Sequence, residues 1–279
     1  MPSTFRLTLE YEGTRYRGFQ EQKNARTVAG ELRSAIETAV GEKVELGGAG
    51  RTDAGVHALA QVAHLRIAKR LGGRESASLL DQVNERLPPD IHVLSLAPAG
   101  PRFHARHDAR LRSYVYQISR RRTALAKRFV WWIRRPLDVD AMSGAAATLV
   151  GRHDFASFCE RAEEQTSTLV VVDRVELVAD GDLVLVRIAA SHFLWKMVRR
   201  VVGALVAVGG GELDHSGLET LLETRGTKGA RSNSPAAHTA RSFSPAEHTA
   251  PPSGLFLERV LYDGDAPLGA LRAPVPVGS

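Results

Sequence analysis

The chain has 279 residues, of which 43% are hydrophobic and 24% are charged, a normal composition for a globular protein. This composition excludes a disordered or collagen-like chain, and the longest apolar run, 201–211, is shorter than the ~20 residues of a membrane span. The single cysteine, Cys159, excludes an intrachain disulfide, a zinc ribbon and a CxxC redox site. The first residues show no secretory pattern, so we expect a soluble cytoplasmic protein.

The formal charge of +6 is concentrated in one segment. Residues 102–135 hold 11 Lys or Arg and one acid, so this basic segment carries +10 and the rest of the chain −4. Arginines hold phosphates and exposed rings stack on bases, so the pattern favours a polyanionic partner such as RNA. The alternative is a core of aromatic residues beside a solvated arginine face. The aromatic residues in question are Phe103, Tyr114, Tyr116, Phe129, Trp131 and Trp132.

Hydrophobic periodicity predicts the same order of elements, β-α-β-β-α-β, in each half of the chain. This order predicts an α+β fold of two ferredoxin-like halves, 1–101 and 102–262. In the first half we expect strand 5–11, helix 28–40 capped by Thr27 and ended by Gly41, strands 43–48 and 63–67, a helix from Ser76 to Leu87, and strand 91–97. In the second half we expect strand 112–119, a helix capped by Asp138 or Asp140 that runs to Val150, strands 169–179 and 183–190 joined at Asp180–Gly181, a helix from Ser191 to Val208, helix 218–224 and strand 254–262.

Residues 225–253 depart from this pattern. RSNSPAAHTA (231–240) is followed by RSFSPAEHTA (241–250), and eight of the ten positions match, which indicates a tandem duplication. Ser, Pro, Ala and Thr dominate, so we expect a mobile loop over 225–253. The stretch 263–279 is rich in Gly, Pro and Ala and is expected to be a flexible tail.

The segment GRTDAGVHA (50–58) is the most unusual local feature. It forms a long loop where the second half has a tight hairpin, and long loops often carry function. It places Asp53 on a glycine-flanked turn beside Arg51. The alternative is an Asx-turn in which Asp53 binds its own backbone. Patterns of metalloproteases, P-loops, dinucleotide sites and nucleophile elbows are absent from the sequence, so metal, nucleotide and acyl-transfer chemistry are disfavoured.

Five segments in order resemble the motif blocks of the TruA family of tRNA pseudouridine synthases, over nearly the whole chain. They are YEGTRYRGFQEQKNARTVAGEL (11–32), AGRTDAGVHALAQVAH (49–64), FHARHDARLRSYVY (103–116), FLWKMVRRVVG (193–203) and TAPPSGLFL (249–257). The resemblance implies a homodimer that isomerises uridine to pseudouridine in the anticodon stem-loop of tRNA, at positions 38, 39 and 40. It implies neither cofactor nor metal, and two ferredoxin-like halves whose sheets meet at a basic cleft.

The resemblance also assigns roles to individual residues. Asp53 matches the catalytic aspartate, Arg199 the arginine that pairs with it, and Tyr114 the active-site tyrosine. Arg51 matches an arginine that helps to extrude the target nucleotide, and Leu255 matches the apolar residue that packs on the base. Beside these, the run Arg120, Arg121 and Arg122 is our candidate for phosphate contacts.

Two positions depart from the family pattern. Phe19 stands where the family usually has Trp, and Ala29 stands where it usually has Gln. We expect both to lie away from the aspartate and to affect packing or substrate contact rather than chemistry.

Three other functions are weighed against this one. A pseudouridine synthase for another RNA differs only in the nucleotides that it modifies. A non-catalytic RNA-binding protein or folding chaperone on the same scaffold would not need the acid, the two arginines and the tyrosine together, and all are present. A metal-dependent nuclease would need paired carboxylates at a plausible spacing, and the sequence offers none.

Overall fold

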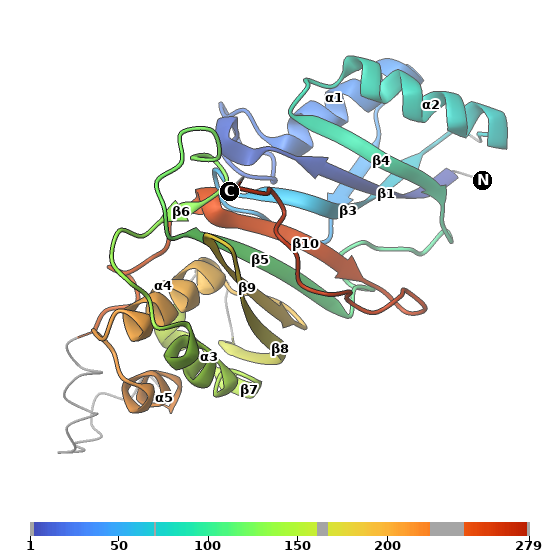
Figure 1. Ribbon diagram of the computed structural model, residues 1–279. Coiled ribbons are helices and arrows are strands. Elements are labelled where there is room, and N and C mark those ends of the chain that lie inside the picture. Colours follow the sequence, from blue (N-terminus) through green and yellow to red (C-terminus); the bar gives the residue numbers. More distant parts are fainter. Residues whose placement is uncertain (1–2, 70, 161–166, 224–242, 278–279) are drawn as a thin grey trace. The chain divides into compact units, whose positions relative to one another are not determined.

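The computed structural model consists of two compact units (Figure 1). Unit 1 comprises residues 1–110 and 256–268, and unit 2 comprises residues 111–255 and 269–279. The structure describes residues 3–69, 71–160, 167–223 and 243–277. Among the helices in these ranges, none has both the length and the apolar character of a bilayer span.

Unit 1 is an α+β layer in which two helices cover one face of a sheet (Figure 1). Strand β1 lies between β4 and β3 and is antiparallel to both. The other edge of β3 carries β2, antiparallel, and the start of β10, parallel. The elements are β1 (Ser3–Tyr11), a 3-10 turn (Gly13–Arg15), α1 (Val28–Val40), β2 (Glu45–Gly48), β3 (His57–Ile67), α2 (Gly73–Arg86), β4 (Ile91–Pro98) and β10 (Leu255–Leu261).

The strands of unit 2 follow the order β5-β9-β8-β7 with neighbours antiparallel, and β6 pairs with β5 in parallel. Helix α4 is buried along almost its whole length. The elements are β5 (Leu111–Ser119), β6 (Trp131–Trp132), α3 (Val139–Ala147), β7 (Gly151–Asp154), a 3-10 turn (Ala156–Phe158), β8 (Leu169–Asp180), β9 (Leu183–Ala190), α4 (Met197–Gly209), α5 (His215–Glu223) and a 3-10 turn (Pro252–Gly254).

Several local predictions are confirmed with their mechanisms. The side chain of Thr27 accepts a hydrogen bond from Gly30 N–H at 3.3 Å, and Gly41 ends α1 in the left-handed region at φ 77°. Asp138 caps α3 by accepting from Ala141 N–H at 2.9 Å. The β8–β9 hairpin turns at Gly181, which has φ 54°. Alternation along β1 buries Phe5, Leu7 and Leu9, as an amphipathic strand requires.

Other predicted boundaries were wrong. The helix expected from Ser191 begins at Met197, because Lys196 before it has φ 62°, which no helix continues through. Helix α2 begins at Gly73 rather than Ser76, since the Glu75 carboxylate reaches back to Gly72 N–H at 2.7 Å. Strand β3 begins at His57, so the loop ends before Ala58. Helix α3 ends at Ala147 rather than residue 150.

The C-terminal segment, expected to be flexible, makes specific contacts in both units. In unit 1, Asp265 accepts two hydrogen bonds from Arg6, the shorter at 2.7 Å. In unit 2, Leu271, Ala273 and Val277 pack on a buried cluster of Ala126, Val130, Leu183 and Leu185. These apolar residues supply burial that a count of Gly and Pro overlooks. Of the loop expected over 225–253, residues 225–242 lie outside the described residues.

Candidate active site

The aspartate loop of unit 1, residues 50–56, connects β2 to β3 and presents Asp53 at a tight turn. Val56 N–H donates to the carbonyl oxygen of Asp53 at 3.1 Å, and Gly55 takes φ 79°. Thr52 is buried, Asp53 is half-buried and Arg51 is exposed. The turn therefore places a carboxylate between the protein interior and solvent, where a substrate can reach it.

The segment 13–19 fastens this loop from one side. Phe19 N–H donates to the carbonyl oxygen of Thr52 at 3.1 Å, and Gly55 N–H donates to the carbonyl oxygen of Tyr16 at 3.3 Å. The hydroxyls of Tyr11 and Thr52 are hydrogen bonded at 2.8 Å in a buried environment. Burial raises the pKa of the Tyr11 hydroxyl well above its usual value, so it stays protonated. These hydrogen bonds fix the loop that carries Asp53.

The close approach of this segment requires glycine at two positions. Gly18 has φ 102°, and a Cβ on it would lie 2.6 Å from the carbonyl oxygen of Thr52. Gly13 lies against the backbone of Val56, and its N–H donates to Nδ1 of the buried His57 at 3.0 Å. Phe19, where the family has Trp, is also part of this contact. The expectation that residue 19 lies away from the aspartate was therefore wrong, because its N–H binds the residue before Asp53.

In unit 2, Arg199 lies on the first turn of α4 and is half-buried. Its Nε donates to the carbonyl oxygen of Ala250 at 2.7 Å. The neighbours Val198, Val201 and Val202 are buried, as predicted for this side of the helix. The guanidinium is therefore oriented by the segment that leads to Leu255.

Tyr116 supports the same segment, a role that sequence analysis missed. Its hydroxyl donates to the carbonyl oxygen of Pro251 at 2.7 Å, and its ring contacts Gly254, where a Cβ would lie 2.6 Å away. Burial raises the pKa of the Tyr116 hydroxyl, and the charge of Arg199 opposes this rise. The second tyrosine of RSYVY was the only sequence signal for this contact. Leu255, just after Gly254, is buried.

Tyr114 lies on β5 opposite Ile188 of β9 and is only 7% exposed. Its ring contacts Phe193 edge-on, with centroids 5.0 Å apart. Phe193 belongs to the block that leads into α4 and Arg199. Tyr114 is thus fixed by the same stretch of chain that carries the arginine.

The arginines of the basic segment differ in their contacts within the protein. Arg120 donates to the carbonyl oxygen of Gly181, and Arg121 forms an ion pair with Asp182 at 2.5 Å. Arg122 lies over the ring of Trp132, 5.8 Å from its centroid. Trp132 is 42% exposed, whereas Tyr114 and Tyr116 are buried, so of these three rings it is the most accessible to an RNA base at the protein surface.

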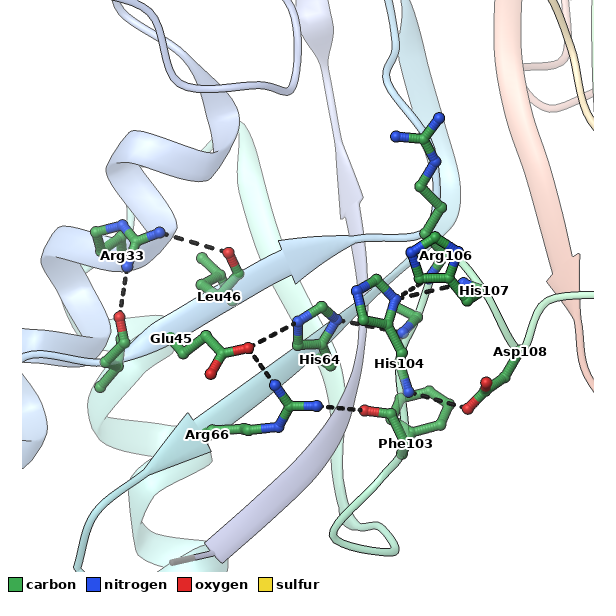
Figure 2. Close-up of polar contacts among 12 residues, drawn as sticks. Arg33, Glu45, Leu46, His64, Arg66, Phe103, His104, Arg106, His107 and Asp108 are labelled. Atoms are coloured by element: carbon green, nitrogen blue, oxygen red, sulfur yellow. Dashed lines mark hydrogen bonds and ion pairs between the residues drawn. The ribbon is translucent and has the colours of Figure 1, made fainter.

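Figure 2 shows a second polar cluster of unit 1, where the block FHARHD (103–108) is attached to β3. His64 Nδ1 accepts from Ala105 N–H at 3.2 Å, and the ring of His104 lies 4.4 Å from that of His64 and 4.2 Å from that of His107. Arg66 pairs with Glu45 and donates to the carbonyl oxygen of Phe103. Burial lowers the pKa of His64 and of His104, and neighbouring positive charge adds to this.

The predicted site residues therefore fall into two groups. Arg51 and Asp53 lie in unit 1, and Tyr114, Arg199, Leu255 and the run 120–122 lie in unit 2. The pairing of Asp53 with Arg199 stays a prediction. In the described ranges, no group of three or more His, Cys, Asp or Glu side chains is arranged to hold a metal ion.

Comparisons with known proteins show the family of the chain. A family model described as tRNA pseudouridine synthase matches residues 8–108 and 145–263. Relatives from Brucella ovis and Brucella canis, both named tRNA pseudouridine synthase A, are 38% identical over 263 residues, covering 92% of this chain and 97% of theirs. A solved structure of an H/ACA RNP bound to a substrate RNA containing 2′-deoxyuridine matches at 10% identity and a TM-score of 0.32. The match covers 73% of this chain and 53% of the other, and it is too weak to support any conclusion.

The family match defines an RNA-modifying isomerase, a pseudouridine synthase that converts uridine to pseudouridine. Within that class, the chain belongs to the TruA family of tRNA pseudouridine synthases.

Proposed function

We propose that this enzyme converts uridines at positions 38, 39 and 40 in the anticodon stem-loop of tRNA, with Asp53 as its essential carboxylate and with neither metal nor cofactor. The observation that carries the proposal is the aspartate loop. A half-buried carboxylate stands on a turn that main-chain hydrogen bonds from Phe19 and Gly55 hold in place. A nucleophile or general base must be held in a fixed position to reach the reacting atom, and these hydrogen bonds hold Asp53 in this way.

The reaction breaks the bond between sugar C1′ and N1 of uracil and forms a bond between C1′ and C5. The base turns between these steps, C5 loses its proton to solvent, and N1 gains one. Atoms and electrons therefore balance within the nucleoside. A carboxylate at Asp53 serves either as a nucleophile, at the sugar or at the base, or as a base at C2′.

Each further residue has a role that its surroundings support. A guanidinium near the aspartate keeps it ionised against desolvation, and Arg199 is the candidate because α4 and Ala250 fix its orientation. Tyr114, held by Phe193, is the candidate for stacking on the flipped uracil. Leu255 packs on that base, and the exposed Arg51 assists its extrusion.

The basic segment is the proposed tRNA contact, with Arg120, Arg121 and Arg122 facing phosphates. Its charge is partly compensated within unit 2, since Asp182 pairs with Arg121 and Glu212 pairs with Arg135. Arg122 and the exposed Trp132 are therefore the stronger candidates for direct RNA contact. In this proposal each half is ferredoxin-like, as the family resemblance implies, and the enzyme is a homodimer that holds one tRNA between its subunits.

Mapping the modified nucleotides tests this proposal. Unmodified tRNA is incubated with the enzyme, and pseudouridine is located by carbodiimide adduct formation and primer extension. We expect primer extension to stop one nucleotide 3′ of positions 38, 39 and 40, and no such stops in a control lacking enzyme. Pseudouridine confined to other positions, or found in another RNA and not in tRNA, would contradict the assigned substrate.

A further inference from the structure

The second copy of the duplicated decapeptide forms a compact turn against α4. The carbonyl oxygen of Ser244 accepts from the N–H groups of Glu247 and His248, at 3.1 and 3.2 Å, and lies 2.9 Å from Nδ1 of His248. The hydroxyl of Thr249 donates to the carbonyl oxygen of Ala246 at 2.7 Å. The ring of Phe243 is buried and stacks on His248, with centroids 4.2 Å apart. The described part of this copy is therefore ordered by its own hydrogen bonds and by one aromatic anchor.

Two hydrogen bonds join this turn to Arg199. Arg199 Nε donates to the carbonyl oxygen of Ala250 at 2.7 Å, and Ala250 N–H donates to the carbonyl oxygen of Arg199 at 3.1 Å. One helical turn later, the carbonyl oxygen of His248 lies where a Cβ on residue 203 would be, so only glycine fits at Gly203. Residues four apart share one face of a helix, so Arg199 and Gly203 form a single docking face for the turn.

The bond at Nε restrains the plane of the guanidinium. Arginine has five N–H donors, and this bond uses one of them, on the side of the group away from the paired Nη atoms. The Nη atoms form the fork that matches a carboxylate. A guanidinium held at Nε therefore needs less ordering when it meets a carboxylate, which favours a short and well-aligned pair.

We propose that residues 243–250 are a positioning element for Arg199, anchored by Phe243 and acting through the Ala250 carbonyl, so that the arginine is presented correctly to the catalytic carboxylate. This inference rests on the proposed function, in which Arg199 keeps Asp53 ionised. Phe243 and Ala250 act through Arg199 and are positioning residues. The segment 251–255 follows directly. Its first carbonyl, that of Pro251, accepts a hydrogen bond from Tyr116, so the chain is also fixed between the turn and Leu255.

The two copies of the repeat are not equivalent for this role. They differ at two positions, where Phe243 and Glu247 of the second copy replace Asn233 and Ala237 of the first. Phe243 supplies the buried ring that stacks on His248, and an asparagine has no ring to supply. The sequence of the second copy is therefore suited to anchor the turn, and that of the first is not.

Deletion of either copy gives a matched pair of proteins. Removing 231–240 or removing 241–250 leaves one decapeptide joined to Pro251, and the products differ only at the Phe/Asn and Glu/Ala positions. We expect the 231–240 deletion to keep wild-type kcat for tritium release from tRNA labelled at uridine C5. We expect the 241–250 deletion to lower kcat at least tenfold with a smaller change in KM, and restoring Phe in place of Asn233 to recover most of it.

A conservative variant separates positioning from a loss of structure. Phe243→Tyr keeps a ring that can stack on His248, so we expect it to retain most of the wild-type kcat, whereas Phe243→Asn should lower kcat at least tenfold with a smaller change in KM. Equal losses of kcat in Phe243→Tyr and Phe243→Asn, or wild-type kcat in both Phe243→Asn and the 241–250 deletion, overturn the proposal.

A third variant separates this proposal from the proposed function. If Arg199→Ala abolishes tritium release while both anchor variants behave as wild type, the role of Arg199 stands and the positioning element does not exist. If Arg199→Ala itself keeps wild-type kcat, the arginine has no catalytic part and both ideas are overturned. Circular dichroism of each variant confirms that folded proteins are being compared.

Discussion

Gly18 lies directly against the carbonyl oxygen of Thr52, the residue that precedes the candidate catalytic aspartate. The contact is possible because Gly18 adopts φ 102° and has no side chain. Next to it, Phe19 N–H donates to the same carbonyl oxygen. The position of Asp53 therefore depends on a residue 35 positions earlier in the chain.

Replacing this glycine should damage both stability and catalysis. Gly18→Ala places a Cβ 2.6 Å from an oxygen in an unfavourable backbone region, and we expect a loss of about 2–3 kcal/mol in the free energy of unfolding. Urea unfolding measures this loss. The matched control is Gly41→Ala, at φ 77° with open space around it, which should lose about 1 kcal/mol. Equal losses in the two variants would show that the contact with Thr52 is unimportant.

The exposed tryptophan of the basic segment should contribute to RNA binding. If Trp132 stacks on a base, Trp132→Ala weakens tRNA binding by about 1–3 kcal/mol, whereas Trp132→Phe keeps most of the affinity because a ring remains. Filter binding at fixed salt measures both. Wild-type affinity in Trp132→Ala would place the contact elsewhere.

The arginine run should respond to neutralisation unevenly. Arg122→Gln removes a cation that lies over Trp132, so we expect weaker tRNA binding and a salt-dependence slope smaller by about 1. Arg121→Gln should have less effect, because Asp182 already compensates that charge. Replacing Arg120, Arg121 and Arg122 together by Glu should flatten the slope further. A slope unchanged in the triple variant would show that the run faces away from the RNA.

The histidine cluster of unit 1, formed by His64, His104 and His107, predicts a pH-dependent stability. Burial lowers the pKa of His64 and His104 below their usual value of 6.5, so the unfolded chain binds protons more readily than the folded one. The free energy of unfolding should therefore fall as pH drops below about 6.5 and change little from this source above it. Urea unfolding between pH 5 and 8 measures the effect.

A non-titrating side chain in place of His104 provides the control for the histidine cluster. In His104→Asn the amide oxygen replaces Nδ1 as acceptor for the N–H groups of Arg106 and His107, so the turn keeps its bonds. The variant should lose part of the decline in stability at low pH. An identical pH dependence in His104→Asn and wild type would exclude His104 as a source.

Local patterns in the sequence predicted what is decided locally. Thr27 and Gly41 mark the ends of α1 because a cap and a left-handed residue act within one turn of chain. The late start of α4 could not be predicted, since nothing in the sequence shows that Lys196 takes a positive φ. Contacts between distant residues were likewise hidden: Arg199 with Ala250, Arg121 with Asp182, and Arg6 with Asp265. The tail, and residues 243–250 of the duplicated loop, were misjudged for the same reason, because composition does not reveal a packing partner.

The central claim is that the carboxylate of Asp53 is essential for the isomerisation. The most direct test is tritium release from tRNA labelled at uridine C5, with wild type, Asp53→Ala and the nearly isosteric Asp53→Asn compared under single-turnover conditions. We expect both variants to bind tRNA within about threefold of wild type, and to release tritium at least about 10⁴-fold more slowly, the scale on which enzymes lose an essential catalytic group. Release by folded Asp53→Asn at a rate near that of wild type would contradict the account.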